Sequence, residues 1–152
     1  MDLYAQFETA PEAETEGVWV DIGGGAEIRV ARAGNPAHRA AADRLTKPYR
    51  AVLRAGGNLP DKTQREIAIE SMVEAILLDW RGVTGPDGGP LPYSKENARR
   101  ALSDLKDFRD LVTQIATAAE TFRKSALEQA AKNFEAPSAG PSSLAARPSP
   151  SF

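Results

Sequence analysis

Two short segments near the start of the chain alternate apolar and polar residues, which is the pattern of a half-buried β-strand. In VWVDIGGGAEIRVAR the apolar positions of these segments are Val18, Val20, Ile22, Ile28 and Val30. The consecutive glycines between them can adopt the positive φ angles that a tight turn needs. The pattern predicts a β-hairpin rather than a phosphate-binding loop, because no helix follows the glycines directly and no Gly-Lys-Ser/Thr ending is present.

The next segment changes to helical spacing. Asn35 followed by Pro36 is a typical helix start, with a capping side chain and then the residue favoured in the first turn. Because Pro48 lacks an amide hydrogen and crowds the carbonyl group of Arg44, we expect the helix to kink or restart there, and the following Gly-Gly pair to end it. The predicted stripe facing the core consists of His38, Ala42, Leu45, Tyr49 and Val52.

A second helix is predicted to begin near Pro60 or Asp61, where Asp61 and Gln64 have the spacing of a capping box. Its apolar positions continue at helical spacing as far as Trp80, and its later half is apolar on nearly every side. A helix of that kind lies in the middle of a core. We therefore expect Trp80 to lie on a central, buried helix.

A turn-rich joint, Gly82 to Tyr93, is predicted to lead into the last helices. Its PDGG sequence favours a chain reversal, and Val83 and Leu91 can pair as the stubs of a short hairpin. Ser94 can then cap a short helix with an acidic residue in its first turn. The final helix is predicted to be the longest, with apolar residues at helical spacing from Leu105 to Ala126.

Together these elements predict an α+β fold that is predominantly α, with an N-terminal β-hairpin packed on a bundle of three or four helices. We expect one mostly helical domain at 17–134, preceded by a flexible acidic segment at 1–16 and followed by a disordered Pro/Ser/Ala-rich tail at 135–152. The predicted structural core consists of Ile69, Val73, Ile76, Trp80, Phe108, Leu111, Ile115 and Phe122.

The amino-acid composition limits the classes of protein to which this chain can belong. Apolar residues make up 41% of the 152 residues and charged residues 26%, an ordinary balance for a globular protein with one core. No run of about 18 apolar residues could span a bilayer, and the acidic start is unlike a signal peptide, so we expect a cytosolic protein without membrane contact. Cysteine is absent and histidine occurs once, which excludes disulfides and thiolate metal sites.

Two residues are candidates for catalysis, and each has a commoner structural explanation. Asp79 beside Trp80 could be the general acid of an active site in an apolar pocket. A carboxylate on the flank of a helix, however, more often pairs with Arg81 or with a basic residue elsewhere. His38 has no nucleophile pattern nearby, so we expect a partly exposed packing residue.

Glu66, Glu70 and Glu74 are spaced four residues apart and are the candidate metal ligands. They lack the histidine partner of carboxylate metal sites, so we expect them to form a solvated helix face. The sequence therefore predicts a protein that is not an enzyme, with no catalytic, cofactor-binding or metal-binding residue.

The charged residues are distributed unevenly. Before any base the chain carries the acids Asp2, Glu8, Glu12, Glu14 and Glu16, whereas residues 29–54 contain seven bases and the single acid Asp43. Such asymmetry suggests a surface that faces a partner, and the predicted partner-binding residues are Arg39, Lys47, Arg50 and Arg54. A nucleic-acid-binding or regulatory protein is the alternative, although the net charge of -2 and the absence of a recognised DNA- or RNA-reading motif make nucleic acid the less favoured partner.

Four segments between Val18 and Phe134 together carry a family resemblance. They are VWVDIGGGAEIRVAR, NPAHRAAADRLTKPYRAVLRAG, AIESMVEAILLDWRGVTGPDGGPLPYSKENARRAL and DFRDLVTQIATAAETFRKSALEQAAKNF. In this order they resemble the tail assembly chaperones of long-tailed bacteriophages and related prophages, most strongly across ILLDWRGV and LPYSKENA. The Ala/Pro/Ser ending of the chain matches nothing in that family.

The resemblance implies a small, mostly helical, non-catalytic protein without a cofactor. It implies expression in the cytoplasm of the host cell and absence from the mature virion. The implied partners are the phage tape-measure protein, which the chaperone keeps soluble, and the tail-tube protein, which it helps to recruit. A longer, frameshifted form of the same protein is a further implied partner.

The same resemblance leads to a prediction at Ala131, Lys132 and Asn133. An Ala-Lys-Asn run can be encoded by GCA AAA AAC, an A-rich tract on which ribosomes can slip back one nucleotide to make a longer product that departs from this chain after the tract. Expression of the gene should then yield two proteins of different length on an immunoblot. Synonymous codons that break the tract should remove the longer one, and a gene without an overlapping downstream reading frame would rule the prediction out.

Overall fold

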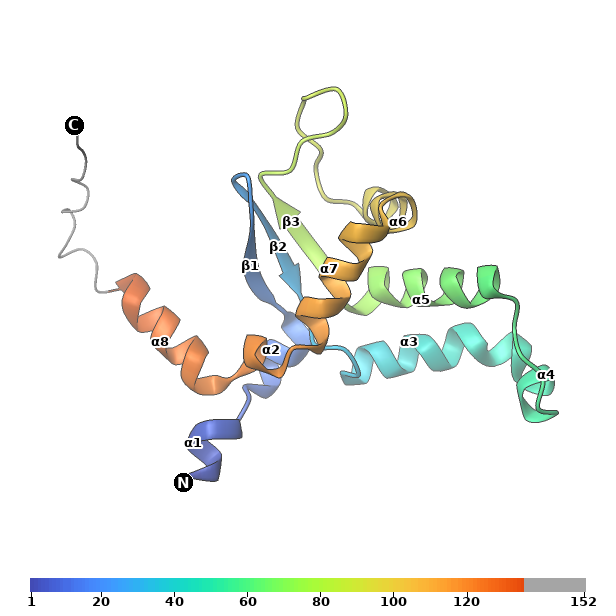
Figure 1. Ribbon diagram of the computed structural model, residues 1–152, viewed down its shortest axis with the longest axis horizontal. Helices are drawn as coiled ribbons and strands as arrows, with labels where there is room; N and C mark the ends of the chain where they lie inside the picture. Colours follow the sequence, from blue (N-terminus) through green and yellow to red (C-terminus); the bar gives the residue numbers. More distant parts are fainter. Residues whose placement is uncertain (136–152) are drawn as a thin grey trace.

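The structure, a computed structural model, describes residues 1–135 and combines a small antiparallel sheet with helices (Figure 1). The strands are β1 (Val18–Gly23), β2 (Ala26–Val30) and β3 (Leu77–Arg81), in the order β1-β2-β3. Helices occupy most of the remaining described residues. The predicted fold class, α+β and predominantly α, is confirmed.

The hairpin of β1 and β2 forms as its alternating pattern predicts. Val18 pairs with Val30 and Val20 with Ile28, which places the apolar positions on the same face of the sheet. The glycines at 23–25 have φ angles of 92°, 64° and 82°, so all three use the backbone region that side chains disfavour. The turn therefore depends on glycine at each of these positions.

Trp80 lies on a strand, and the prediction of one helix continuing to Trp80 is wrong. Helix α5 (Asp61–Ala75) ends at Ile76, whose ψ of -61° accompanies a φ of -120°, and the chain then enters β3. Trp80 pairs with Ile28 of β2. A short apolar run is compatible with either a helix or a strand, and here the free edge of β2 provides the backbone partners that favour a strand.

The first predicted helix is broken at Pro48, as expected. It consists of α3 (Pro36–Thr46), the 3-10 turn η1 (Lys47–Tyr49) and α4 (Arg50–Arg54). Asn35 caps α3 by accepting a hydrogen bond of 3.0 Å from the backbone N–H of His38. The Asn35 amide also donates to the carbonyl of Ala75 at 3.2 Å, so the buried cap ties the start of α3 to the end of α5.

Capping is confirmed at one later helix and differs at another. Ser94 caps α6 (Lys95–Asp104) by accepting from the N–H of Asn97 at 3.0 Å. At the start of α5 the cap residue is Pro60, and Gln64 instead donates its side-chain amide to the carbonyl of Leu59 at 2.7 Å. The predicted capping box is therefore absent from α5, since Asp61 is already the first helical residue.

The long final helix of the prediction is divided into three pieces. They are α7 (Lys106–Thr117), the 3-10 turn η2 (Ala119–Phe122) and α8 (Lys124–Glu135). Ala118 and Arg123 have extended backbone angles, and these two positions separate the pieces. The break turns Phe122 into the interior, where its side chain is fully buried. Burial of a large aromatic ring outweighs the local preference for a continuous helix.

The core lies between the sheet, α5, α6 and α7. Of the predicted core residues, Ile69, Val73, Ile76, Trp80 and Phe122 are buried. Phe108, Leu111 and Ile115 are half-buried, and the fully buried positions on α7 are Val112 and Ala116. Helix α7 is thus rotated relative to the prediction, and Leu105, expected on its apolar stripe, is 55% exposed.

The first sixteen residues form two short helices, α1 (Leu3–Phe7) and α2 (Pro11–Glu16), that the sequence does not predict. Backbone hydrogen bonds join this segment to the start of α8: Ala10 N–H donates to Phe122 at 3.0 Å, and Lys124 N–H donates to Glu8 at 2.9 Å. Arg32 adds an ion pair with Glu14 at 2.8 Å. These contacts link residues 8–14 to the domain; of the predicted tail at 135–152, residues 136–152 lie outside the described part.

Helices that could cross a membrane are not found between residues 1 and 135, because none combines the necessary length and hydropathy.

We predict that Trp80→Ala lowers the free energy of unfolding by about 3 to 5 kcal/mol, through lost burial and the cavity left behind. The indole is 5% exposed and packs edge-on against Tyr93, at 5.3 Å between ring centroids. Urea unfolding followed by circular dichroism measures the change. Trp19→Ala is the control: this half-buried tryptophan on β1 contacts the Arg81 guanidinium, and its removal should cost clearly less. Equal losses for the two variants would contradict the central role of Trp80.

Candidate functional site: an apolar groove beside Trp80

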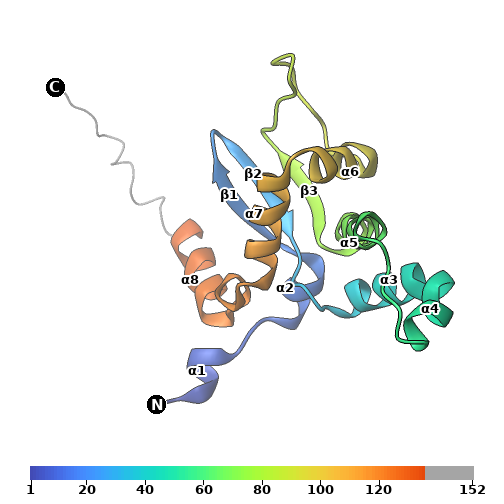
Figure 2. The same cartoon turned by 45° about the vertical axis from the view of Figure 1, so that its right-hand side comes forward.

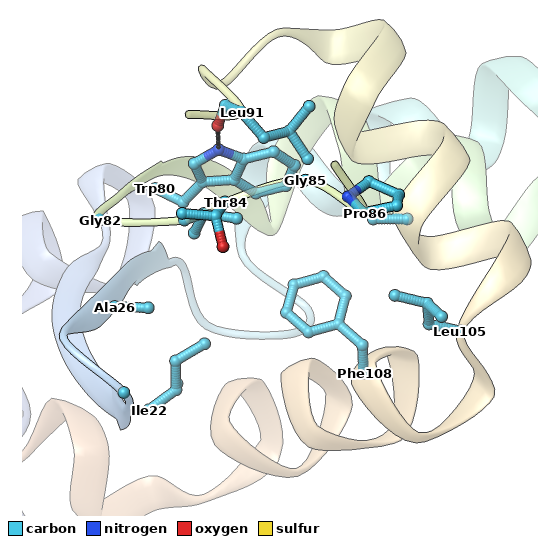
Figure 3. A pocket seen from close by; sticks show the side chains of 13 residues that line it. Ile22, Ala26, Trp80, Gly82, Thr84, Gly85, Pro86, Leu91, Leu105 and Phe108 are labelled. Atoms are coloured by element: carbon cyan, nitrogen blue, oxygen red, sulfur yellow. Dashed lines mark hydrogen bonds between the residues drawn. The ribbon is translucent and has the colours of Figure 1, made fainter. Parts of the chain in front are cut away.

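A groove with a volume of about 490 Å³ opens between the tip of the β1–β2 hairpin, the loop after β3, and the junction of α6 and α7 (Figure 3). We call it the Trp80 groove. Residues from all of these parts line it, among them Ile22, Trp80, Val83, Leu91, Leu105 and Phe108. The joint at residues 82–93 therefore forms one side of this groove.

Trp80 holds the groove together through its ring and its indole N–H. The N–H donates to the carbonyl of Leu91 at 2.7 Å, which fastens the far end of the loop to β3. Phe108 approaches the indole edge-on, with 6.5 Å between ring centroids. Because the indole donor is satisfied internally, the face it presents to the groove is apolar.

Tyr93 makes a second attachment at the base of the loop. Its hydroxyl donates to the carbonyl of Leu77 at 2.7 Å. Leu77 is the first residue of β3, so this bond lies at the opposite end of the strand from Arg81. Burial, with a smaller contribution from the charge of Asp79, raises the pKa of the Tyr93 phenol. The hydroxyl therefore stays protonated and able to donate at physiological pH.

Gly82 lets the loop approach the hairpin turn closely. Its φ is 71°, and a Cβ atom built there would lie 2.2 Å from the carbonyl oxygen of Gly25. Any side chain at this position would force the hairpin tip and the loop apart. The width of the groove is thus set by backbone contact between two segments far apart in sequence.

The outer part of the loop forms a closed turn. Leu91 N–H donates to Val83 at 2.9 Å, as the predicted pairing of these residues requires, and Gly85 N–H donates to Gly89 at 2.8 Å. The Asp87 carboxylate accepts from the N–H of Gly89 at 3.0 Å. The N–H groups of Gly85, Gly89 and Leu91 are thus bonded within the loop, and the loop lines the groove mainly with the side chains of Val83, Pro86 and Leu91.

The lining of the groove suits binding rather than proton transfer. Apart from the indole N–H, which Leu91 occupies, only Thr84 among the lining residues carries a polar side chain. Leu105 is more than half exposed at the rim. A groove with these walls can accept aliphatic or aromatic side chains of another polypeptide.

Asp79, the sequence candidate for a general acid, does not line the groove. Its carboxylate is half-buried and accepts a hydrogen bond of 2.8 Å from the backbone N–H of Trp80. Arg81, one of the two kinds of partner expected for Asp79, pairs with Glu27 at 2.7 Å and lies over the ring of Trp19. The predicted Asp79–Arg81 ion pair is therefore not formed.

His38 is half-buried between α3 and α5. Its Nδ1 accepts from the N–H of Gly34 at 2.9 Å, and its Nε2 lies 3.4 Å from the hydroxyl of Ser71. Burial lowers the pKa of the imidazole, which favours the neutral form that can accept from Gly34. These contacts give His38 a packing role at the base of α3, away from the Trp80 groove.

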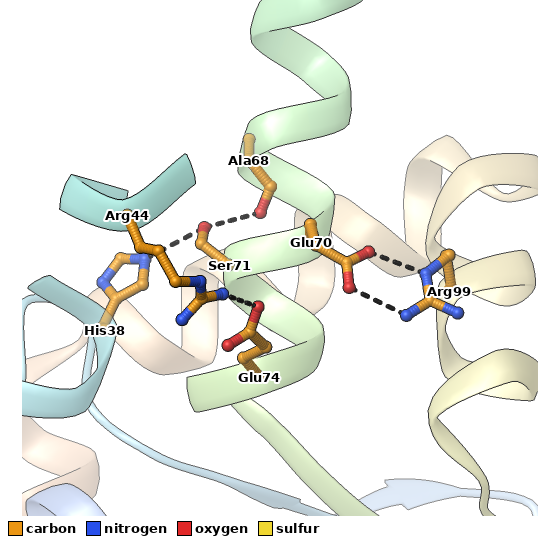
Figure 4. Close-up of polar contacts among 7 residues, drawn as sticks. All are labelled: His38, Arg44, Ala68, Glu70, Ser71, Glu74 and Arg99. Atoms are coloured by element: carbon orange, nitrogen blue, oxygen red, sulfur yellow. Dashed lines mark hydrogen bonds and ion pairs between the residues drawn. The ribbon is translucent and has the colours of Figure 1, made fainter. Parts of the chain in front are cut away.

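The three spaced glutamates of α5 have different surroundings (Figure 4). Glu70 receives two hydrogen bonds from the Arg99 guanidinium, at 2.7 and 2.8 Å, and Glu74 pairs with Arg44. Glu66 is exposed. The expected solvated face is therefore formed only in part, because two of its three carboxylates make ion pairs that join α5 to the neighbouring helices α6 and α3. No group of acidic or histidine side chains arranged for a metal is found between residues 1 and 135.

The predicted partner-binding bases form a separate surface. Arg39, Lys47, Arg50 and Arg54 are all exposed on α3, η1 and α4. Arg39 donates to the carbonyl of Gly34 at 2.7 Å, and none of the four makes an ion pair with the described residues. Figures 1 and 2 show α4 at the far end of α3 from the sheet, and none of the four bases lines the Trp80 groove.

Sequence reasoning did not find the groove, although it noted most of its components. The turn chemistry of residues 82–93 and the apolar residues around it were visible, but the groove depends on Trp80 belonging to a strand. The available signal was the clustering of Val83, Leu91 and Leu105 beside a glycine-rich turn. An apolar residue next to a turn, where burial is not expected, points to a binding surface.

The fold and the groove define a small, mainly helical α+β protein with an apolar groove. A family model described as YdaY prophage protein matches residues 33–133, which is more than half of the chain. The chain therefore belongs to the YdaY prophage protein family. The match includes Trp80, the loop and the α6–α7 junction, but not the hairpin. No curated protein and no solved structure matches the chain.

We predict that Glu70→Gln lowers the free energy of unfolding at pH 7 by about 0.5 kcal/mol, because the Glu70–Arg99 pair is partly exposed. The hydrogen bonds from Arg99 lower the pKa of Glu70 below its ordinary value of 4.5. The contribution of the ionised carboxylate is thus fully present above pH 4.5 and is lost as the pH falls through the lowered folded-state pKa.

Chemical unfolding of the two proteins at several pH values should show their stabilities converging below pH 4.5. Glu66→Gln is the matched control, since it removes one charge from an exposed position of the same helix and should leave stability unchanged. A Glu70→Gln loss that persists undiminished at the lowest pH would show that the ion pair is not its cause.

Proposed function

We propose that this prophage protein is a non-catalytic tail assembly chaperone that keeps the tape-measure protein soluble and helps to recruit tail-tube subunits. Membership of a prophage protein family supports the phage context. The resemblance of the chain to tail assembly chaperones supports the specific role. On this proposal the protein acts in the host cytoplasm and is left out of the mature virion.

The observation that carries the proposal is the Trp80 groove. A tape-measure protein that has not yet been enclosed by the tail tube exposes long apolar stripes on its helices, which aggregate unless they are covered. An amphipathic helix places apolar side chains into a partner's groove at three- and four-residue intervals. A groove walled by Ile22, Trp80, Leu91 and Phe108, with Leu105 at its rim, is suited to such side chains.

The apolar walls also favour a client that varies in sequence. Contacts in the groove come from side-chain shape and burial, because nearly all of its lining side chains are apolar. Apolar burial has no direction, so many similar helical segments can occupy one groove. This property suits a chaperone for a long and repetitive helical protein.

Co-expression of this protein with a fragment of the tape-measure protein encoded beside it tests the proposal. We predict that the wild-type protein keeps the fragment in the soluble fraction and co-purifies with it. Leu105→Asp should reduce the soluble fragment several-fold, because it places a charge at the rim of an apolar groove. Since Leu105 is 55% exposed, the variant should melt at nearly the wild-type temperature.

Ser103→Asp is the matched control, because it adds the same charge two residues away at an exposed position of α6 that does not line the groove. It should retain wild-type solubilising activity. Precipitation of the fragment in the presence of the wild-type protein would remove the main support for the chaperone proposal. Equal activity of Leu105→Asp and wild type would place the binding surface elsewhere.

Nucleic-acid binding is the second candidate, and the observation that favours it is the exposed set of Arg39, Lys47, Arg50 and Arg54. Phosphate contacts by such bases would give affinity that falls steeply with salt. The groove has no part in this alternative. The acids of residues 1–16, a segment without lysine or arginine, count against this alternative because they repel a polyanion.

A further inference from the structure

The residues that precede the sheet form an exposed acidic and apolar surface, which we call the acidic arm (residues 2–16). Leu3, Tyr4 and Phe7 are 62%, 78% and 56% exposed on α1. The acids of the segment are Asp2, Glu8, Glu12, Glu14 and Glu16, and it contains no lysine or arginine. Apolar side chains of this size are usually covered when they cluster on a short helix.

The η1 turn and α4 carry the opposite charge, on a surface that we call the basic patch (residues 47–54). Val52 and Leu53 are 46% and 42% exposed. Lys47, Arg50 and Arg54 are exposed around them, and the segment contains no acid. The patch therefore offers a small aliphatic surface surrounded by positive charge.

We propose that the acidic arm of one copy of this protein binds the basic patch of a second copy. The two surfaces complement each other in two ways. Each has exposed apolar side chains, and the acids of the arm that make no ion pair with the described residues, Asp2, Glu12 and Glu16, are opposite in charge to the bases of the patch. The contact would cover Leu3 and Tyr4 with Val52 and Leu53 and would bring the acids of the arm toward Arg50 and Arg54.

The arm cannot reach the patch of its own molecule without breaking its attachment to the domain. Thr9 forms a β-bridge with Arg123, and Ala10 and Lys124 add backbone hydrogen bonds at the same place. Only the residues before Glu8 can move while these bonds persist. Figures 1 and 2 both show α1 and α4 at opposite ends of the molecule, so the contact must join two molecules.

A second copy fits the patch better than nucleic acid does. Phosphates would engage the bases but would leave Val52 and Leu53 uncovered. The arm, in contrast, can pair its acids with the bases and cover these two apolar side chains. The contact joins two different surfaces, so each copy keeps one free arm and one free patch. Such head-to-tail contacts extend into rings or open chains. Because each surface is small, the association is weak and is reduced by salt.

Sedimentation velocity of the full chain, over about 10 to 500 μM, tests the proposal. The weight-average sedimentation coefficient of the wild-type protein should rise with concentration and fall back when salt is added. The patch variant Arg50→Glu/Arg54→Glu keeps its arm, and the arm variant Leu3→Ser/Tyr4→Ser keeps its patch. Each variant alone should remain monomeric over this range, with a circular dichroism spectrum like that of the wild type.

An equimolar mixture of the two variants gives the decisive measurement. The intact arm of the patch variant can bind the intact patch of the arm variant, and the damaged surfaces prevent further growth. The mixture should therefore form a one-to-one dimer and no larger species. The control Lys95→Glu/Arg100→Glu makes the same charge change on α6 and should associate like the wild type.

Several results would overturn the proposal. They are a wild-type protein that is monomeric throughout the range, a single variant that associates like the wild type, and a mixture that stays monomeric. Co-sedimentation of a short DNA duplex with the wild-type protein, lost in the patch variant and without any self-association, would assign the patch to nucleic acid instead. None of these results depends on the tape-measure protein, so the chaperone proposal stands or falls separately.

Discussion

The side chain of Trp80 joins parts of the molecule that are distant in the sequence. Its strand pairs with the hairpin through Ile28, its indole N–H donates to Leu91, and its ring packs against Tyr93 and Phe108. A buried tryptophan needs a partner for its N–H, and the carbonyl of Leu91 provides one. This single requirement brings the loop of residues 82–93 back onto the sheet and so creates the groove.

Local signals in the sequence were sufficient for several elements. The glycine-turned hairpin, the Asn35 cap, the break at Pro48 and the Ser94 cap all depend on residues within a few positions of one another. Their energetics are decided by backbone conformation and by short-range hydrogen bonds. Such elements form in much the same way whatever surrounds them, and the sequence therefore predicts them.

Two of the wrong assignments were decided by tertiary contacts. Residues 77–81 become a strand because β2 offers an unpaired edge, and the end of α7 breaks because Phe122 can enter the interior. Neither partner is near in sequence, and periodicity alone cannot distinguish the alternatives. The groove was missed for the same reason, since it exists only once β3, the loop and the α6–α7 junction have come together. The exposed bases at Arg39, Lys47, Arg50 and Arg54 were predictable because charge asymmetry is visible without a fold.

The closed loop at residues 83–91 has a consequence for how such proteins diverge. A backbone hydrogen bond between Gly85 and Gly89 closes its tip, and a second one between Val83 and Leu91 closes its base. The tip can therefore be exchanged or lengthened without disturbing the strand or the helix on either side. Among relatives that differ in this loop, it would act as an exchangeable rim, altering which side chains the groove admits while the sheet and helices beneath it stay the same.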